Sequence, residues 1–460
     1  MVELIMRVSL LLLLTILTAS AKSINPAVKR IVDAVSEDRI AAIEKKLESF
    51  ETRSIYSDPD NPKRGIGAAR RWIFEQFQSY SPRLQVSFDS YKVKKQKRVF
   101  RDVEVVNVVA VLPGALNAER QFIVAGHYDS LHLVRKPRST DPAAAADTPE
   151  IDEEKSAAMP FAPGVTDDAS GTAAVMELAR IMSQYEFEKT IVFVAFAGEE
   201  EGLIGSTLFA AKARRENRII DAVLNNDIIG SELAGNGLLE NRRIRVFSEH
   251  PDDSPSRQLA RYIQEIGERY VPAMRVDLIF RHDRLQRGGD HTPFNYEGYA
   301  AVRFTTPAEN YANQHTATDT FANTSPGYAA RVARINAAAL ASLALAPKAP
   351  IVTREVKTGE YKGRIVANIG RGKSRYAALL KWSNENPEPD LAGYAIVYRS
   401  TTAPYWEKEL FVGAVNEYTL EDVSIDDLVF GVKAIDKDGN ESLVSAYADT
   451  PRPKRVIEVY

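Results

Sequence analysis

The pattern of hydrophobic positions changes near residue 100 of the chain. The segment 36–50 places Ile40, Ile43 and Leu47 on one helical face, so residues 24–80 are expected to be largely helical. From Val103 onward, short apolar runs rich in β-branched and aromatic residues take over: 103–112, 121–125, 190–197, 219–224 and 299–305. Runs of this kind are typical of strands buried on both faces of a sheet.

Amphipathic stretches with a helical period separate several of these runs: 169–185, 205–215, 254–270 and 327–346. Buried strands alternating with helices predict an α/β fold with a mainly parallel central sheet flanked by helices. Residues 133–163 interrupt the alternation and are rich in Ala, Pro, Asp and Glu. We interpret them as a long surface insertion with little regular structure, and favour disorder over a lid.

The helical signals end at residue 346, and residues 347–350 form a Pro/Ala linker. Beyond it, the runs 377–382, 393–399, 416–420 and 428–436 predict the short strands of an all-β sandwich. Residues 351–450 resemble a fibronectin type III domain, on the basis of the stretches 380–382, 390–398 and 432–442. Leu428 departs from that family, which usually has a Tyr there. Residues 451–460 are interpreted as a tail.

The first 21 residues have the pattern of a secretory signal peptide. Arg7 precedes the apolar run 8–17, and Ala19-Ser20-Ala21 offers small residues for cleavage. An uncleaved anchor is the alternative, but a run of about ten residues is too short to span a bilayer as a helix. The expected mature protein is secreted or periplasmic, with no stable membrane insertion. Its catalytic part would span residues 22–346.

The composition narrows the chemistry that the chain can perform. A chain of 460 residues suggests two or three domains, and its net charge of −3 disfavours general nucleic-acid binding. The absence of Cys excludes disulfides, thiolate zinc sites and iron–sulfur clusters. A metal ion would therefore have to be held by Asp, Glu or one of the six His residues.

Five short polar stretches carry the candidate chemistry: 126–130, 166–171, 198–202, 225–227 and 314–316. Four of them follow a predicted strand and one opens a predicted helix. Because ligands of open parallel α/β sheets bind beyond the carboxyl ends of the strands, these stretches are expected to converge. Two His and several carboxylates without sulfur suit one or two divalent ions, with zinc first. One carboxylate could bridge two such ions.

Each stretch also has an ordinary structural interpretation. Asp167 and Asp168 could cap a helix, a lone His after a strand is usually structural, and a Glu triplet is usually solvated. However, Glu199, Glu200 and Glu201 follow the strongly apolar run 191–197. Three carboxylates at a buried strand end repel one another and require a compensating cation. The joint occurrence of the stretches therefore favours a metal site.

The same stretches resemble metallopeptidase family 28, the co-catalytic dizinc exopeptidases that include bacterial leucyl aminopeptidases. The resemblance covers about residues 36–346. It rests on the motifs His127-Tyr-Asp-Ser, Asp167-Asp-Ala-Ser-Gly, Glu199-Glu-Glu-Gly-Leu-Ile-Gly-Ser, Leu224-Asn-Asn-Asp, Asp290-His-Thr-Pro-Phe and His315-Thr-Ala-Thr-Asp-Thr. It adds a zinc exopeptidase-like fold to the expectations.

The resemblance implies that the protein binds two Zn²⁺ ions, and it assigns the residues that hold each ion. His127 and Asp227 would bind one zinc, and Glu200 and His315 the other. Asp167 would bridge the two ions. The family also implies a cis peptide between Asp167 and Asp168.

The remaining roles complete an implied hydrolytic mechanism. Asp129 would hydrogen-bond the second ring nitrogen of His127 and fix its tautomer. Glu199 would be the general base for a water held by both zinc ions. The implied function is a secreted zinc-dependent exopeptidase, an aminopeptidase that hydrolyses N-terminal residues from peptide substrates.

Several alternatives remain open on the sequence. A carboxypeptidase, a dipeptidase or a glutaminyl cyclase would share the fold, and a non-catalytic binding protein is the less favoured option. Glu201 or Glu309 could bind a free ammonium, and Arg303 a free carboxylate. Gln314 stands where the family often has a Tyr that stabilises the oxyanion, and Tyr311 is a possible substitute. The oligomeric state and the side-chain preference stay open.

Overall fold

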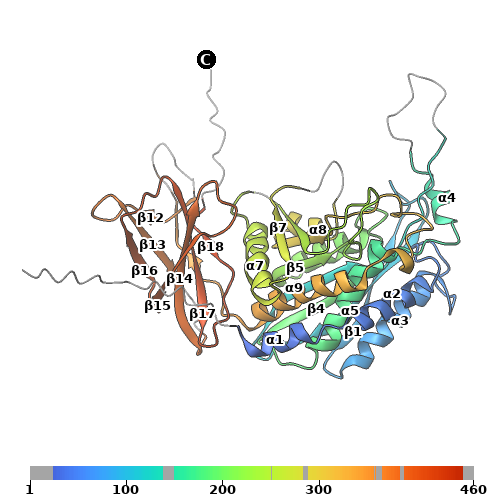
Figure 1. Cartoon of the computed structure of the whole chain (residues 1–460), viewed down its shortest axis with the longest axis horizontal. Helices are drawn as coiled ribbons and strands as arrows, with labels where there is room; N and C mark the ends of the chain where they lie inside the picture. The colour runs from blue at the N-terminus through green and yellow to red at the C-terminus, as the bar shows by residue number, and fades with distance from the viewer. Residues whose placement is uncertain are drawn as a thin grey trace, which may run out of the picture.

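The computed structural model of the chain describes residues 24–137, 150–249, 251–282, 288–356, 358, 365–383 and 388–448. The expected signal peptide, the middle of the insertion and the tail lie outside these residues. The described chain consists of an α/β part that ends with a long helix and an all-β part beside it (Figure 1). The predicted fold class is confirmed.

An eight-stranded sheet forms the centre of the α/β part, with strand order β1-β2-β4-β3-β5-β8-β6-β7. The central neighbours β4, β3, β5 and β8 are parallel, whereas β1, β2 and β6 join through antiparallel pairs. The strand bounds are β1 Gln85–Val93, β2 Val103–Leu112, β3 Asn117–His127, β4 Lys189–Phe196, β5 Ile219–Asn226, β6 Arg243–Ser248, β7 Arg275–Ile279 and β8 Ala301–Thr305.

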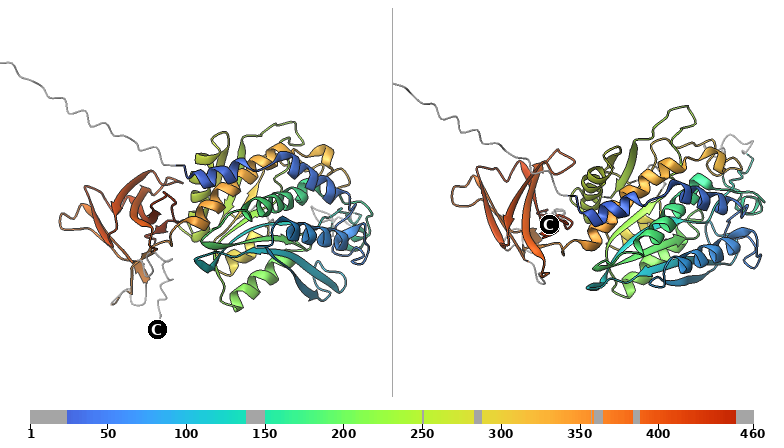
Figure 2. Two further views of the ribbon diagram at one scale, coloured as in Figure 1. Left: turned by 90° about the horizontal axis from the view of Figure 1, so that it is seen from below. Right: turned by 60° about the horizontal axis from the view of Figure 1, so that its bottom comes forward.

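Helices cover both faces of this sheet (Figure 2). One face and its helices form the larger apolar core, and α6 with α8 packs on the other face. The helices of the larger core are α1 Pro26–Asp33, α2 Glu37–Glu48, α3 Gly65–Tyr80, α5 Ser170–Met182, α7 Pro255–Tyr270 and α9 Pro326–Leu345. The smaller core uses α6 Ile204–Arg215 and α8 His291–Tyr296.

The five predicted strands and four predicted helices of this part are present, but three strands were missed. β1, β6 and β7 lie toward the two margins of the sheet, where one side of each strand carries charged or polar residues. Their sequences therefore lack the continuous apolar run used to recognise a strand. The predicted helical region 24–80 is also interrupted by a loop between α2 and α3.

The predicted insertion contains more structure than expected in its described part. Helix α4, Glu153–Ala157, follows its N-cap Asp152, whose side chain accepts a hydrogen bond from the Lys155 amide. Arg135 and Ile151 pair as an isolated β-bridge. The prediction of disorder for residues 138–149 lies outside the described residues.

The all-β part contains two antiparallel four-stranded sheets and a two-stranded one. Buried side chains including Trp382, Ile396 and Phe430 form its core. The strand bounds are β9 Ile351–Val352, β10 Arg354–Val356, β11 Ile365–Ala367, β12 Ile369–Gly370, β13 Ala377–Ser383, β14 Leu391–Ser400, β15 Lys408–Gly413, β16 Glu417–Glu421, β17 Leu428–Asp436 and β18 Ser445–Ala446.

Polar side chains tie the all-β part to α7. Arg399 donates two hydrogen bonds to the Asp253 carboxylate, at 2.8 and 3.1 Å, just before this helix begins. Arg269 pairs with Glu441 at 2.8 Å, and the Trp406 indole donates to Gln258. The all-β part is therefore held at a fixed place on the α/β part. Within the described residues, no helix is long and apolar enough to cross a membrane.

Candidate metal centre

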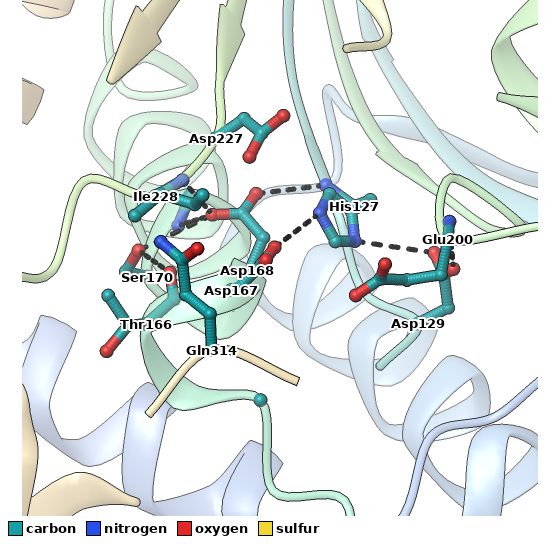
Figure 3. Close-up of polar contacts among 12 residues, drawn as sticks. His127, Asp129, Thr166, Asp167, Asp168, Ser170, Glu200, Asp227, Ile228 and Gln314 are labelled. Carbon is teal, nitrogen blue, oxygen red and sulfur yellow. Dashed lines mark hydrogen bonds and ion pairs between the residues drawn. The ribbon is translucent and has the colours of Figure 1, made fainter. Parts of the chain in front are cut away.

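The parallel strands bring the predicted site residues to one edge of the sheet. His127 is the last residue of β3, Asp227 directly follows β5, and Glu199 and Glu200 follow β4. Because β4, β3 and β5 are parallel neighbours, the side chains at their carboxyl ends meet. Figure 3 shows His127, Asp167 and Asp227 gathered there, with Asp129 and Glu200 on the other side of His127.

Two groups of potential metal ligands share one carboxylate. His127, Asp167 and Asp227 form one group, and Asp167, Glu200 and His315 form the other, with the ligand atoms of each group within 4.8 Å of one another. His127 Nε2 lies 3.1 Å from Asp167 Oδ1. His315 Nε2 lies 3.1 Å from Asp167 Oδ2 and 3.0 Å from Glu200 Oε2. The two oxygens of Asp167 thus face different His residues, as a bridging carboxylate requires.

These residues fit zinc by donor type and spacing. Imidazole nitrogens and carboxylate oxygens are ligands that zinc accepts at about 2.0–2.2 Å, so two of them on one tetrahedral ion lie about 3.3 Å apart. The observed separations of 3.0–3.1 Å are close to that value. The buried Oε1 of Glu200 also has no hydrogen-bond partner among the described residues. A buried group of this kind requires a partner, which a metal ion would supply.

The charges of the ligand residues also favour a bound cation. Although burial opposes it, Asp129 and Asp167 raise the pKa of His127 well above its usual range. Burial also acts to raise the pKa of the Asp167 carboxyl, but His127 and His315 outweigh it and hold this pKa well below its usual range. The two imidazole rings and the Asp167 carboxylate thus attract one another strongly, and the cluster favours additional positive charge. A bound metal ion would supply such charge and release any proton that the ligands carry.

Asp129 and Asp168 position the ligand loops. Asp129 Oδ1 lies 3.5 Å from His127 Nδ1, and its Oδ2 accepts a hydrogen bond from the Glu200 amide. Asp168 accepts hydrogen bonds from the backbone amides of His127, Gly171 and Ile228. Asp168 thereby joins the ends of β3 and β5 to the start of α5 (Figure 3). The peptide between Asp167 and Asp168 is cis.

Two further buried residues hold the segment that carries Asp167. The Asp319 carboxylate accepts hydrogen bonds from the amides of Thr166 and Asp167 at 2.9 and 3.0 Å. Arg53 is fully buried and donates to the carbonyl oxygens of Tyr128, Pro163 and Gly164. Asp319 lies in a motif that the sequence already singles out. Arg53 gave no signal, because a lone Arg in a helical region is usually a surface residue.

Glu199 lines a cavity of about 360 Å³ together with the ligands Asp167, Glu200, Asp227 and His315. Burial raises the pKa of its carboxyl well above its usual range, and the neighbouring Asp227 and Glu200 add to this effect. A carboxyl group whose proton affinity is raised and which lies beside the metal ligands is suited to proton transfer.

Two of the three candidates for recognising a chain end, Arg303 and Glu309, are already engaged. The third, Glu201, is buried beside the cavity and not in its lining, and its Oε2 has no hydrogen-bond partner among the described residues. Arg303 lies in the cavity but pairs with the ligand Asp227 at 3.1 Å and donates to the Gly288 carbonyl. Glu309 pairs with Arg245, and Gln314 donates to Glu309 at 3.3 Å. Tyr311 is half exposed. The side-chain amide of Gln314 is therefore directed at the Glu309 carboxylate, which Arg245 in turn holds in place.

A centre of this composition at the carboxyl edge of an α/β sheet defines a metal-dependent hydrolase. The chain belongs to peptidase family M28, a zinc metallopeptidase family, whose model matches residues 107–340. A "probable zinc metalloprotease" of Leptosphaeria maculans is 36% identical over 439 residues, which cover 89% of this chain and 94% of that protein.

Solved structures show the same fold. The LapA aminopeptidase of Legionella pneumophila has a TM-score of 0.51 at 19% identity and covers 70% of this chain and 76% of its own. The glutaminyl cyclase of Fimbriiglobus ruber has a TM-score of 0.50 at 19% identity and covers 66% of this chain and 94% of its own. At such identities the likeness concerns the fold, so it leaves the type of reaction open.

Proposed function

We propose that this protein is a zinc-dependent aminopeptidase that binds two zinc ions and removes N-terminal residues from peptides. The observation that carries the proposal is the sharing of Asp167 between two ligand groups, with Glu199 in the same cavity. Asp167, Glu200, Asp227, His127 and His315 would hold the ions. When bound, zinc would activate water and polarise the scissile carbonyl.

The side chains of the protein would then move the proton and hold the parts in place. Glu199 accepts a proton from the attacking water and delivers it to the leaving amine nitrogen. Asp129 keeps the His127 ring in one tautomer, so that Nε2 faces the centre. Arg303 neutralises part of the charge on Asp227.

The preference for an N-terminus follows from the charges in the cavity. Four carboxylates line it, and an ammonium group is attracted to them. Two arginines also line it: Arg303 is already paired with Asp227, and Arg98 donates a hydrogen bond to the Glu200 carbonyl at the edge of the cavity, so the carboxylates outnumber the cations. This favours an aminopeptidase over a carboxypeptidase.

The test is mass-spectrometric cleavage of a peptide pool by zinc-loaded protein. Each peptide is present with a free and with an acetylated N-terminus, and some begin with Gln. We expect loss of single N-terminal residues from the free set only. Cleavage of acetylated peptides, or shortening from the C-terminus, would contradict an aminopeptidase. Loss of ammonia from the Gln peptides without hydrolysis would identify a glutaminyl cyclase instead.

Export and the nature of the all-β part belong to the same proposal. The first 21 residues support secretion or a periplasmic location, which N-terminal sequencing of protein recovered outside the cytoplasm would test. An intact Met1 on that protein would argue against cleavage. The strand pattern of residues 351–448 supports a fibronectin type III-like sandwich.

A further inference from the structure

A strongly basic segment lies beside the catalytic cavity. Residues 92–101, the end of β1 and most of its connection to β2, contain six Lys or Arg and no Asp or Glu, in a chain whose net charge is −3. We call these ten residues the cationic hairpin. Such a concentration of one charge in a near-neutral chain creates a local positive potential.

The structure accounts for only part of this charge. Lys94 pairs with Asp102 at 2.8 Å, and the Arg101 guanidinium donates to the Tyr56 carbonyl and lies over the Tyr56 ring. Lys92, Lys97 and Arg98 form no ion pair with any described residue, and all three are exposed. The nearby Glu201 carboxyl attracts Arg98 without forming an ion pair with it, so the three positive charges are only partly compensated and can attract a ligand.

These three cations line a second cavity, of about 650 Å³, which adjoins the catalytic one. Arg98 and Gly202 line both cavities. Arg98 lies across Gly202, with its Cδ 3.7 Å from the place of a Cβ at that residue. One guanidinium nitrogen of Arg98 donates to the Glu200 carbonyl at 2.6 Å. Arg98 is thus anchored beside a proposed zinc ligand, at the junction of the two cavities.

We propose that Arg98, Lys92 and Lys97 form a subsite that binds a carboxylate of the peptide substrate and selects acidic peptides. The inference rests on the proposed function. A substrate in the catalytic cavity would extend past Arg98 into the second cavity. A guanidinium held in place by one hydrogen bond still has donors for a carboxylate, which it binds in a forked geometry. The substrate ammonium would be repelled there and held at the acidic centre.

The carboxylate could come from an Asp or Glu side chain or from the C-terminus of a short peptide. A peptide series separates these sources. It compares a neutral peptide with a C-terminal amide, the same peptide with Asp or Glu at each of the first three positions, and the neutral peptide with a free C-terminus. The measured quantity is the ratio of kcat/KM for the carboxylate peptide to that for the neutral amide.

We expect a ratio of about tenfold or more for the wild type at low salt, falling as salt is added. Arg98→Gln and, separately, Lys97→Gln should bring the ratio toward one. Lys97 is an exposed side chain that forms no ion pair or hydrogen bond with any described residue, so this variant stays informative if Arg98→Gln folds poorly. Lys373→Gln makes the same charge change in an exposed turn of the all-β part and should leave the ratio unchanged.

A binding measurement separates this subsite from the proposed activity. Fluorescence anisotropy of the same peptides with zinc-loaded Glu199→Ala protein gives Kd without turnover. Tighter binding of acidic peptides that Arg98→Gln abolishes would support the subsite even if the wild type hydrolyses nothing. Hydrolysis or binding with no preference for a carboxylate, or a preference that survives both substitutions, would overturn it.

Discussion

Glu199 and Asp167 lie in the same cavity, yet their surroundings give them different tasks. Asp167 faces two His residues at 3.1 Å, which hold its pKa low and keep it ionised as a ligand. Glu199 forms no such pair with any described residue, and burial raises the pKa of its carboxyl despite the charge of His127. One carboxylate is therefore suited to binding a cation and the other to exchanging a proton.

Replacement of the proposed base should separate chemistry from metal binding. In Glu199→Ala the ligands remain, so zinc content should stay at the wild-type level. Turnover should fall by about 10²- to 10⁴-fold, the usual contribution of a general base. Metal analysis and peptide kinetics on the same sample check this. Wild-type turnover in the variant would reject Glu199 as the base.

Removal of the shared carboxylate, unlike removal of the base, should lower the zinc content as well as the activity. Asp167→Ala takes one ligand from each group, so we expect the loss of at least one zinc ion per chain along with activity. Inductively coupled plasma mass spectrometry after gel filtration measures the metal. Asp102→Ala, which removes an exposed carboxylate on the cationic hairpin side, is the control and should retain full zinc content. Full occupancy in Asp167→Ala would exclude a bridging role.

At the scale of elements, the site depends on how closely α5 approaches the ends of β3 and β5. Gly171, in the first turn of α5, permits this approach. A Cβ there would overlap both the Asn226 carbonyl oxygen and the Asp168 carboxylate. The same carboxylate accepts the amide hydrogen bonds that join the ligand loops. Helix packing and ligand placement are thus a single geometric requirement.

Gly171→Ala should therefore damage stability and metal binding together. We expect a loss of about 2 kcal/mol in the free energy of unfolding, typical of overpacking a buried position, and a weaker affinity for zinc. Gly370→Ala is the control, because its Cβ would lie 3.5 Å from Leu379, an ordinary contact. Urea unfolding of both metal-free variants measures the difference. Equal stabilities would show that α5 can move away without cost.

At the scale of the whole molecule, a third carboxylate cluster joins the two parts of the chain. Glu265 of α7, Glu409 of β15 and Glu441 have the spacing of metal ligands. Here the central cation is Lys433 of β17, which is buried and pairs with all three, while Arg269 pairs with Glu265 and Glu441 from the side of α7. These carboxylates raise the pKa of Lys433 despite its burial. In this cluster the Lys433 ammonium balances the charge of the carboxylates, whereas in the catalytic centre a metal ion would do so.

Removal of this ammonium should weaken the join between the parts. Lys433→Met removes the cation that all three carboxylates share and leaves Arg269 to two of them, so we expect a loss of about 3 kcal/mol in the free energy of unfolding. Lys381→Met removes an exposed pair with Glu417 and should cost about 0.5 kcal/mol. Guanidinium unfolding of both compares them. A similar small effect in both variants would show that the buried cluster contributes little.

The sequence anticipated the parts of the molecule whose signals are local. The central strands are continuous apolar runs because both of their faces are buried, and the polar residues at their ends stand out against them. The strands β1, β6 and β7 were not predicted, because strands near the margin of a sheet alternate apolar with polar residues and lack a continuous apolar run. Arg53 could not be assigned either, because three of its four carbonyl partners lie in segments that only the fold brings to it.

The amino-acid sequence by itself determined the fold class, the ligand types and the family, because strand burial, the lack of Cys and the spacing of polar motifs are properties of the linear chain. Only the tertiary structure decided that Asp167 faces both His residues, that Arg303 forms an ion pair with Asp227, and that Arg98 lies between the catalytic cavity and a second, cationic one. Those relations depend on distances between side chains far apart in sequence, which are fixed by the packing of the sheet and helices and by no local pattern.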